Sequence, residues 1–343
     1  MQALGACALT TYRAFDVAAK KLADDPKKET WSAAMDAWQE AEVMQFGPLG
    51  PTSLPGGQGL RDAFYSWPLI GRCQIDRAIA NKTYASADFG KGLVTTRGLG
   101  ALEYLLFYAG EGNGCGSSED INASGTWAAL SKEELAGRRA AYAKVVASEL
   151  SARSGALVEL WTTSYLATFT TAGNGSTVYR TADAALNSVF DALMYVDSVT
   201  KDRKVAIPIG LVDPAACDAP PCPELLESKY AVRGKHHVRS NLVALRKLVT
   251  GCDPEFKGQA FDDLFDARGA GSVGDELDAD LVAAIAAVDA FPHASFEDAM
   301  AKGDLAAIEK LRAAIKRVTD TLKTDFVTVL HLDLPMRVAG DMD

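Results

Sequence analysis

The segment from Arg97 to Phe107 places a carboxylate on an apolar face of a predicted helix. At about 3.6 residues per turn, Leu106 and Phe107 fall within about a sixth of a turn of Glu103. An ionised carboxylate in a dry core costs several kcal/mol unless its charge is compensated. We therefore expect Glu103 to meet a cation, a dense hydrogen-bond shell or an environment that raises its pKa.

Two glycines, Gly98 and Gly100, lie at the start of the same predicted helix. A glycine in a helix interior costs roughly 1 kcal/mol relative to alanine. The pair therefore predicts that another element approaches the helix closely with its backbone at this point.

Two other predicted helices carry an acidic residue beside apolar side chains. A helix over residues 28–44 has an aromatic face that ends at Glu42. A later helix has Asp76 next to its apolar side. Glu42 is a candidate partner for the site around Glu103, and the alternative is that Glu42 is solvated at a fraying helix end.

This arrangement resembles the GxHxxE signature of the imelysin family, extracytoplasmic bacterial proteins named for an insulin-cleaving peptidase and often linked to iron uptake. The signature reads Gly-Leu-Gly-Ala-Leu-Glu over residues 98–103, so Gly100 stands where the family has its histidine. The resemblance covers most of the chain through further blocks, which are Glu42 with Phe46-Gly47-Pro48, Trp67-Pro68-Leu69, Ile75-Asp76, Glu227-Ser228-Lys229-Tyr230, Asn241 to Gly251, and Ala339 to Asp343.

The resemblance implies a metal site. In the family pattern, a histidine and a glutamate one helical turn apart would join two carboxylates from neighbouring helices in a site suited to iron or calcium. In this chain the ligand set would be Glu42, Asp76 and Glu103, and Gly98 and Gly100 would fill the other signature positions. Loss of the histidine predicts a weaker site, a preference for harder ions, or no site.

The alternative to a metal site is a buried polar network in which Glu103 only accepts hydrogen bonds. The candidate donors are Thr96, Arg97, Tyr104 and the Gly-rich loop. In that case Glu103 would be structural.

Three functions stay open for a chain with this resemblance. The first is an imelysin-like extracytoplasmic bacterial protein that binds iron or another metal, or takes part in its uptake, without acting as a peptidase. The second is a non-catalytic helical interaction protein that has lost the metal site. The third is a metallopeptidase, which needs protein ligands, an open coordination position and a general base. The chain has no HExxH motif, and whether it is an enzyme stays open.

All four histidines lie in the second half of the chain, at His236, His237, His293 and His331. His236 and His237 open a predicted helix, where adjacent side chains point about 100° apart. We expect both to be solvated at this helix start, so that they do not serve one shared site.

The expected partner is a metal ion, a small ligand or a peptide in a cleft between two subdomains. The net charge of −10 and the pI near 5.0 come without a basic stripe and argue against nucleic acid. No apolar run reaches the roughly 18 residues of a transmembrane segment.

The resemblance places the protein in the periplasm or at the cell envelope. Leu4-Gly5-Ala6-Cys7 resembles the lipobox of a lipoprotein, but no basic and apolar leader precedes it. Because Cys7 continues into the following residues at helical spacing, we expect a helix there. A lipid anchor on a longer precursor, with its leader outside this sequence, is compatible with this interpretation.

The six cysteines include no CxxC pair. Cys217 and Cys222 bracket the segment Asp-Ala-Pro-Pro, a spacing that could close a small disulfide loop in an oxidising compartment. The alternative is that the cysteines are free thiols.

The chain is predicted to be all-α, because no strand-like alternation extends beyond four or five residues. The resemblance implies two helical-bundle subdomains packed together. The turn-forming segment at residues 173–176 predicts a boundary between a first bundle over residues 1–172 and a second over residues 173–343. A long helical region from Ser131 is predicted to break near Gly155, and another helix is predicted over residues 181–203.

Overall fold

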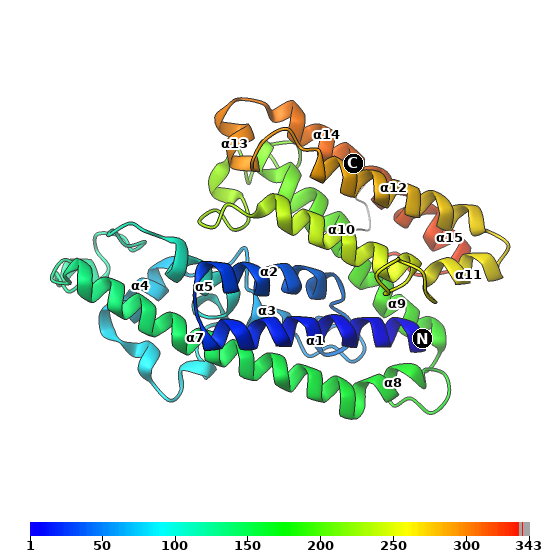
Figure 1. Cartoon of the computed structure of the whole chain (residues 1–343), viewed down its shortest axis with the longest axis horizontal. Helices are drawn as coiled ribbons and strands as arrows, with labels where there is room; N and C mark the ends of the chain where they lie inside the picture. The colour runs from blue at the N-terminus through cyan, green and yellow to red at the C-terminus, as the bar shows by residue number, and fades with distance from the viewer. Residues whose placement is uncertain (336–337, 339–343) are drawn as a thin grey trace.

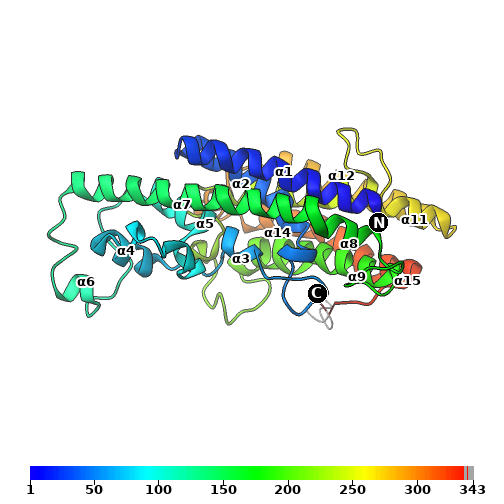
Figure 2. The ribbon, with the colours of Figure 1, turned by 90° about the horizontal axis from the view of Figure 1, so that it is seen from below.

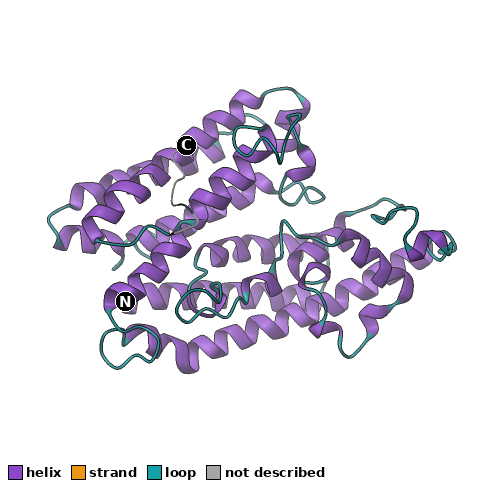
Figure 3. Cartoon of the chain, turned by 180° about the vertical axis from the view of Figure 1, so that it is seen from behind, coloured by secondary structure: helices purple, strands orange, loops and turns teal. Residues whose placement is uncertain are grey.

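Helices make up all of the regular secondary structure in the part of the chain that the structure describes, residues 1–335 and 338. In this computed structural model the helices form two groups, one above the other in Figure 1, and Figure 3 shows the same arrangement from behind. The all-α prediction is confirmed. The predicted match of residues 339–343 to the end of the family pattern lies outside the described residues.

The first group runs from blue to green in Figure 1 and precedes the second group along the chain. Its members are α1 (Gln2–Asp24), α2 (Lys28–Val43), α3 (Arg61–Phe64), α4 (Arg72–Asn81), α5 (Gly98–Phe107), α6 (Asp120–Ala123), α7 (Lys132–Leu160) and α8 (Leu166–Thr170). The second group contains α9 (Ala182–Leu193), α10 (Gly234–Thr250), α11 (Phe261–Ala267), α12 (Gly271–Asp289), α13 (Phe296–Ala301), α14 (Leu305–Thr321) and α15 (Val327–Leu330). The predicted boundary falls in the connection between α8 and α9.

Long helices pack side by side within each group. In the first group α1 packs against α2 and α7, and α5 packs against α7 and α2. Figure 2 shows α1 and α7 running along each other. In the second group α12 packs against α10 and α14. The two groups meet where α2 packs against α10, so polar side chains on this pair of helices are enclosed between the groups.

The helix α7 begins with a capping box, as its sequence predicts. The Ser131 hydroxyl accepts a hydrogen bond from the Glu134 N–H, and the Glu134 carboxylate accepts one from the Ser131 N–H, both at 3.1 Å. The predicted break near Gly155 is wrong, because α7 continues to Leu160. One glycine costs only about 1 kcal/mol in a helix, and packing along α1 outweighs that cost.

The helix predicted over residues 181–203 changes type part-way. It is α-helical to Leu193 and continues as the π-helix η6 (Val196–Ala206). Apolar residues spaced three and four apart predict a helix without distinguishing these two types. Segments of π-helix are rare and occur often at functional sites, and η6 carries the fully buried Lys204 toward α2 and α10.

None of the helices in the described part combines the length and the apolar character that crossing a bilayer requires.

All six cysteines form disulfides. The predicted bond between Cys217 and Cys222 is confirmed, so the free-thiol alternative is wrong. The sequence did not indicate the other two pairs, which are Cys7 with Cys252 and Cys73 with Cys115. The bond from Cys7 in α1 to Cys252, just after α10, joins the two groups of helices covalently.

Removing the Cys7–Cys252 disulfide should destabilise the protein more than removing the Cys217–Cys222 disulfide. The first closes a loop with a sequence separation of 245 residues and the second a separation of 5 residues. Loop-closure entropy predicts losses of roughly 5 and roughly 2 kcal/mol in the free energy of unfolding. Denaturant unfolding of the paired Cys→Ala variants measures both losses, and a larger loss for the short loop contradicts the expectation.

Candidate functional site

The start of α5 depends on close approach by the preceding chain. Gly98 has φ +70°, and a Cβ on it would lie 2.4 Å from the Phe64 carbonyl oxygen, so only glycine fits there. The predicted close backbone approach is confirmed at this position. At Gly100 the neighbour is a side chain, because a Cβ there would lie 2.1 Å from Ile70 Cδ1.

The Glu103 carboxylate is buried, as predicted, and is held by the second group of helices. Its Oε1 accepts hydrogen bonds from the backbone N–H groups of Tyr230 at 2.9 Å and Ala231 at 3.1 Å. Burial raises the pKa of Glu103 to about 7. The two backbone hydrogen bonds lower this pKa, but burial has the larger effect. Glu103 therefore changes charge near neutral pH.

The donors that the sequence predicted for Glu103 have other partners. Arg97 pairs with Glu149 at 2.9 Å, and the Tyr104 hydroxyl donates to Asp76. The Thr96 hydroxyl donates to a carbonyl within its own short helical turn. The predicted donors are therefore wrong, and the true donors lie more than a hundred residues further along the chain.

Asp76 is completely buried in α4 and has a hydrogen-bond shell of its own. Its carboxylate accepts from the Tyr104 hydroxyl at 2.9 Å and from the Gly114 N–H at 2.7 Å. Burial raises the pKa of Asp76, although both hydrogen bonds oppose this. The Cys73–Cys115 disulfide ties the loop that carries Gly114 to α4 and so keeps the second donor in place.

Glu42 is completely buried at the end of α2, so the solvated alternative is wrong. Its Oε1 accepts from Arg61 Nε at 2.8 Å. The negative charge of Glu42 contributes, after burial, to raising the pKa of Tyr195 in the second group. Glu42 therefore pairs with Arg61 within the first group.

The three predicted metal ligands meet three different sets of partners. Glu42 pairs with Arg61, Asp76 bonds to Tyr104 and Gly114, and Glu103 bonds to backbone amides. Within residues 1–335 and 338, no three side chains of His, Cys, Asp or Glu are grouped so that they could hold a metal ion.

A pocket of about 160 Å³ opens beside Glu103, between the two groups of helices. We call it the signature pocket, and its polar lining comprises Arg72, Glu103, Tyr104, Glu224, Ser228, Lys229 and Tyr230. The Arg72 guanidinium lies 4.5 Å from the centre of the Tyr108 ring, and its Nε lies 3.2 Å from the Tyr104 hydroxyl. The pocket therefore combines two carboxyl groups, Glu103 and Glu224, with two cations and an aromatic wall.

A second buried polar cluster, which the sequence analysis missed, lies where α2 meets α10 and η6. Lys204 Nζ donates to Gln39 at 2.6 Å and lies 3.0 Å from Glu227 Oε2. His237 Nδ1 also lies 3.0 Å from that oxygen, and Asn241 donates to the Gln39 carbonyl at 2.7 Å. Burial would raise the pKa of Glu227, but the charges of Lys204 and His237 outweigh burial and lower it.

This cluster corrects the prediction for one histidine. His237 is completely buried, whereas the sequence predicted that both His236 and His237 are solvated. His236 is exposed, as expected. His237 faces Glu227. The helix faces predicted from the sequence included neither Gln39 nor Lys204, and Lys204 follows the helix predicted over residues 181–203, so this cluster was not indicated.

Residues 6–324 match the model of the imelysin family. The chain belongs to the imelysin family. Its structure is similar to that of an imelysin-like protein from Psychrobacter arcticum 273-4, with a TM-score of 0.66 and 17% sequence identity over 97% of this chain and 92% of the other. A precursor assigned as iron-regulated protein A from Parabacteroides distasonis ATCC 8503 also has a TM-score of 0.66, with 18% identity over 96% of this chain and 90% of its own. None of the curated proteins compared with the chain matches it.

At these identities the two structures establish a shared fold, and the family prediction is confirmed. In this imelysin, Ile70 fills the space beside Gly100 where the predicted family histidine would stand. A large side chain at position 100 therefore needs a smaller one at position 70.

Changing Gly100→His in this imelysin should destabilise it by about 1–3 kcal/mol, because the new side chain collides with Ile70. Combining it with Ile70→Ala should recover part of the loss. Denaturant unfolding of both single variants and the double variant gives the coupling energy. Strictly additive losses in the double variant would contradict this packing account.

Changing Glu103→Gln in this imelysin should alter how its stability depends on pH. The folded-state pKa of about 7 exceeds the ordinary value of 4.5, so the folded protein keeps a proton that the unfolded chain has released in this range. The wild type therefore loses stability as pH rises through this window. Relative to Glu103→Gln, we expect a loss on the order of 3 kcal/mol between about pH 4.5 and pH 8.

Urea unfolding of both proteins at several pH values in this window measures the difference. If the wild type and Glu103→Gln keep a constant difference in free energy of unfolding across the window, Glu103 does not titrate near neutral pH.

Proposed function

We propose that this imelysin binds iron in the signature pocket, as an anionic iron complex, and acts in iron acquisition at the cell envelope without hydrolysing peptides. The observation that carries the proposal is the placement of Glu103. Its Oε1 accepts hydrogen bonds from the Tyr230 and Ala231 N–H groups of the second group. The same side chain lines a pocket between the two groups of helices.

The charges around the pocket favour an iron complex over a bare metal ion. Arg72 and Lys229 line it together with Glu224 and Glu103. While Glu103 keeps its proton, the two positive charges exceed the single negative charge of Glu224, so a free cation is repelled. The same charges attract an anionic complex in which iron carries oxygen donors of its own. Ionised Glu103 would add one hard carboxylate ligand from the protein.

The other two members of the predicted ligand set take supporting roles in this proposal. Asp76 orients Tyr104, which lines the signature pocket. Glu42 fixes Arg61 and does not belong to the lining of the signature pocket. The proposal therefore keeps Glu103 as the direct ligand and treats Asp76 and Glu42 as residues that hold the surrounding structure.

Three observations support the rest of the proposal. One structural neighbour is assigned as an iron-regulated protein, which favours iron over other metals. The three disulfides fit a protein of an oxidising compartment. No histidine is among the described residues that line the signature pocket, which disfavours hydrolysis because a metallopeptidase needs several protein ligands and a general base.

Calorimetric titration of the metal-stripped protein with iron(III) citrate tests the proposal. We expect binding to the wild type, and at least tenfold weaker binding to Glu103→Gln and Arg72→Gln, since each removes one charged contact. Because protons compete for Glu103, affinity should rise about tenfold per pH unit up to about pH 7 and then level off.

The matched control is Glu309→Gln, which changes an exposed glutamate of α14 far along the chain from the pocket. Citrate alone, Fe²⁺, Zn²⁺ and Ca²⁺ serve as competing ligands. Absence of iron(III) citrate binding, or equal binding by the wild type and Glu103→Gln, contradicts the proposal. Tighter binding of any bare ion than of the complex contradicts the charge argument.

A further inference from the structure

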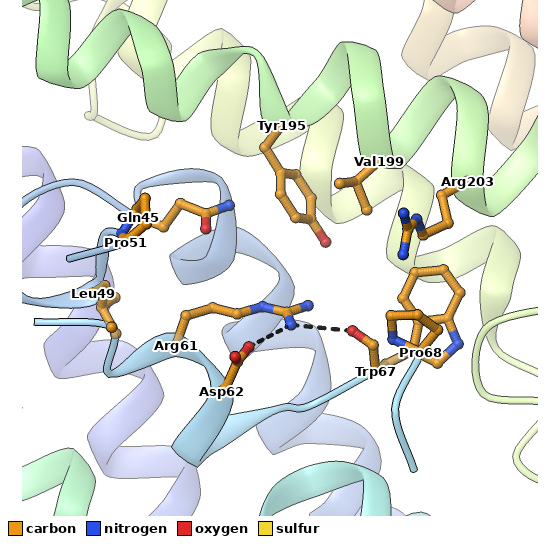
Figure 4. Close-up of a pocket in the computed structure, with 11 residues that line it drawn as sticks. Gln45, Leu49, Pro51, Arg61, Asp62, Trp67, Pro68, Tyr195, Val199 and Arg203 are labelled. Carbon is orange, nitrogen blue, oxygen red and sulfur yellow. Dashed lines mark hydrogen bonds and ion pairs between the residues drawn. The ribbon is translucent and has the colours of Figure 1, made fainter. Parts of the chain in front are cut away.

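A second pocket, of about 350 Å³, lies on the other side of Trp67 and Pro68 from the signature pocket. Figure 4 shows that its walls come from the chain around α3 and from the start of η6, so it also lies between the two groups of helices. Its volume falls in the range of pockets that hold small molecules. Nothing in the proposed iron site uses it.

One positive charge in this second pocket is uncompensated. The Arg61 guanidinium is bound by Glu42, by Asp62 at 2.9 Å and by the Trp67 carbonyl at 3.1 Å. Arg203 also lines the pocket; it is exposed to solvent and forms no ion pair or hydrogen bond with any residue in the described part of the chain. The pocket therefore has one arginine available for a negatively charged group.

A buried amide points into the same space. Gln45 is only 9% exposed, and its side chain has no hydrogen-bond partner among the described residues. Figure 4 shows the amide directed into the pocket, toward Tyr195. The amide reaches solvent in the pocket and is therefore available to hydrogen-bond to a bound molecule.

The remaining walls are apolar. They are formed by Leu49, Pro51, Trp67, Pro68 and Val199. Apolar and aromatic walls with a few placed polar groups are the usual composition of a small-molecule site.

We propose that the second pocket binds a small organic monocarboxylate with an apolar body. Arg203 pairs with the carboxylate, the Gln45 amide donates a hydrogen bond to it, and the apolar body packs against Trp67 and Pro68. The side chain of Asp62, 61% exposed at the pocket, repels additional negative charge. The single available arginine and this carboxylate together select a monoanion over a polyanion.

Calorimetric titration of the whole chain with benzoate at pH 7 tests this proposal. Benzoate has one carboxylate and a ring that matches the apolar walls. We expect binding to the wild type that weakens about 10- to 100-fold in Arg203→Gln, since a hydrogen-bonded charge pair is lost. Gln45→Leu should weaken benzoate binding less than Arg203→Gln does, because only one neutral hydrogen bond is lost.

The matched control is Arg180→Gln, which changes an exposed arginine outside the pocket and should leave benzoate binding unchanged. Benzamide, which has the same ring without the charge, should bind at least tenfold more weakly than benzoate. The proposal is overturned if benzoate does not bind, if Arg203→Gln binds it as well as the wild type, or if citrate binds this pocket more tightly than benzoate.

Discussion

Three carboxylates are removed from water where the two groups of helices meet, and their desolvation constrains the whole arrangement. Glu42, Glu103 and Glu227 are all buried there. Each buried charge costs several kcal/mol unless donors replace the lost water. For Glu103 and Glu227 a donor comes from the opposite group, either the Tyr230 backbone or the Gln39 side chain. Docking of the two groups and completion of the site are therefore one event.

This constraint also explains why the functional features lie at the junction. The segment around Trp67 separates two pockets, and each is closed by residues of the second group, Tyr230 on one side and Tyr195 on the other. Charges inside the junction are compensated by close partners, as Arg61 is by Glu42. Charges that line the pockets, such as Arg72 and Arg203, are left facing space that a ligand can fill.

The sequence predicted well what depends on local spacing. The main helices follow from helical periodicity. The hydrogen-bonded burial of Glu103 follows from the cost of desolvating its carboxylate, and the close approach at Gly98 from the cost of a glycine in a helix. The sequence left a Cys217–Cys222 disulfide and free thiols as alternatives, because it showed only that these two cysteines are close together along the chain. The family resemblance added the signature and the two-bundle expectation.

What the sequence did not predict depends on contacts between distant segments. The donors to Glu103 lie 127 and 128 residues away, and the Cys7–Cys252 bond spans 245 residues. Burial of His237 follows from the placement of Glu227, which no periodicity of its own helix reveals. The π-helix η6 has the same apolar spacing as an α-helix, so only the assembled structure distinguishes it.

The central claim is that the junction holds Glu103 as a buried acid that titrates near neutral pH. An infrared pH titration of the protonated carboxyl band, taken as the difference between the wild type and Glu103→Gln, measures this directly. The account predicts a band that disappears with a midpoint near pH 7. A midpoint at or below the ordinary glutamate value of 4.5 would contradict it, because it would mean that the backbone donors or a cation compensate the charge completely.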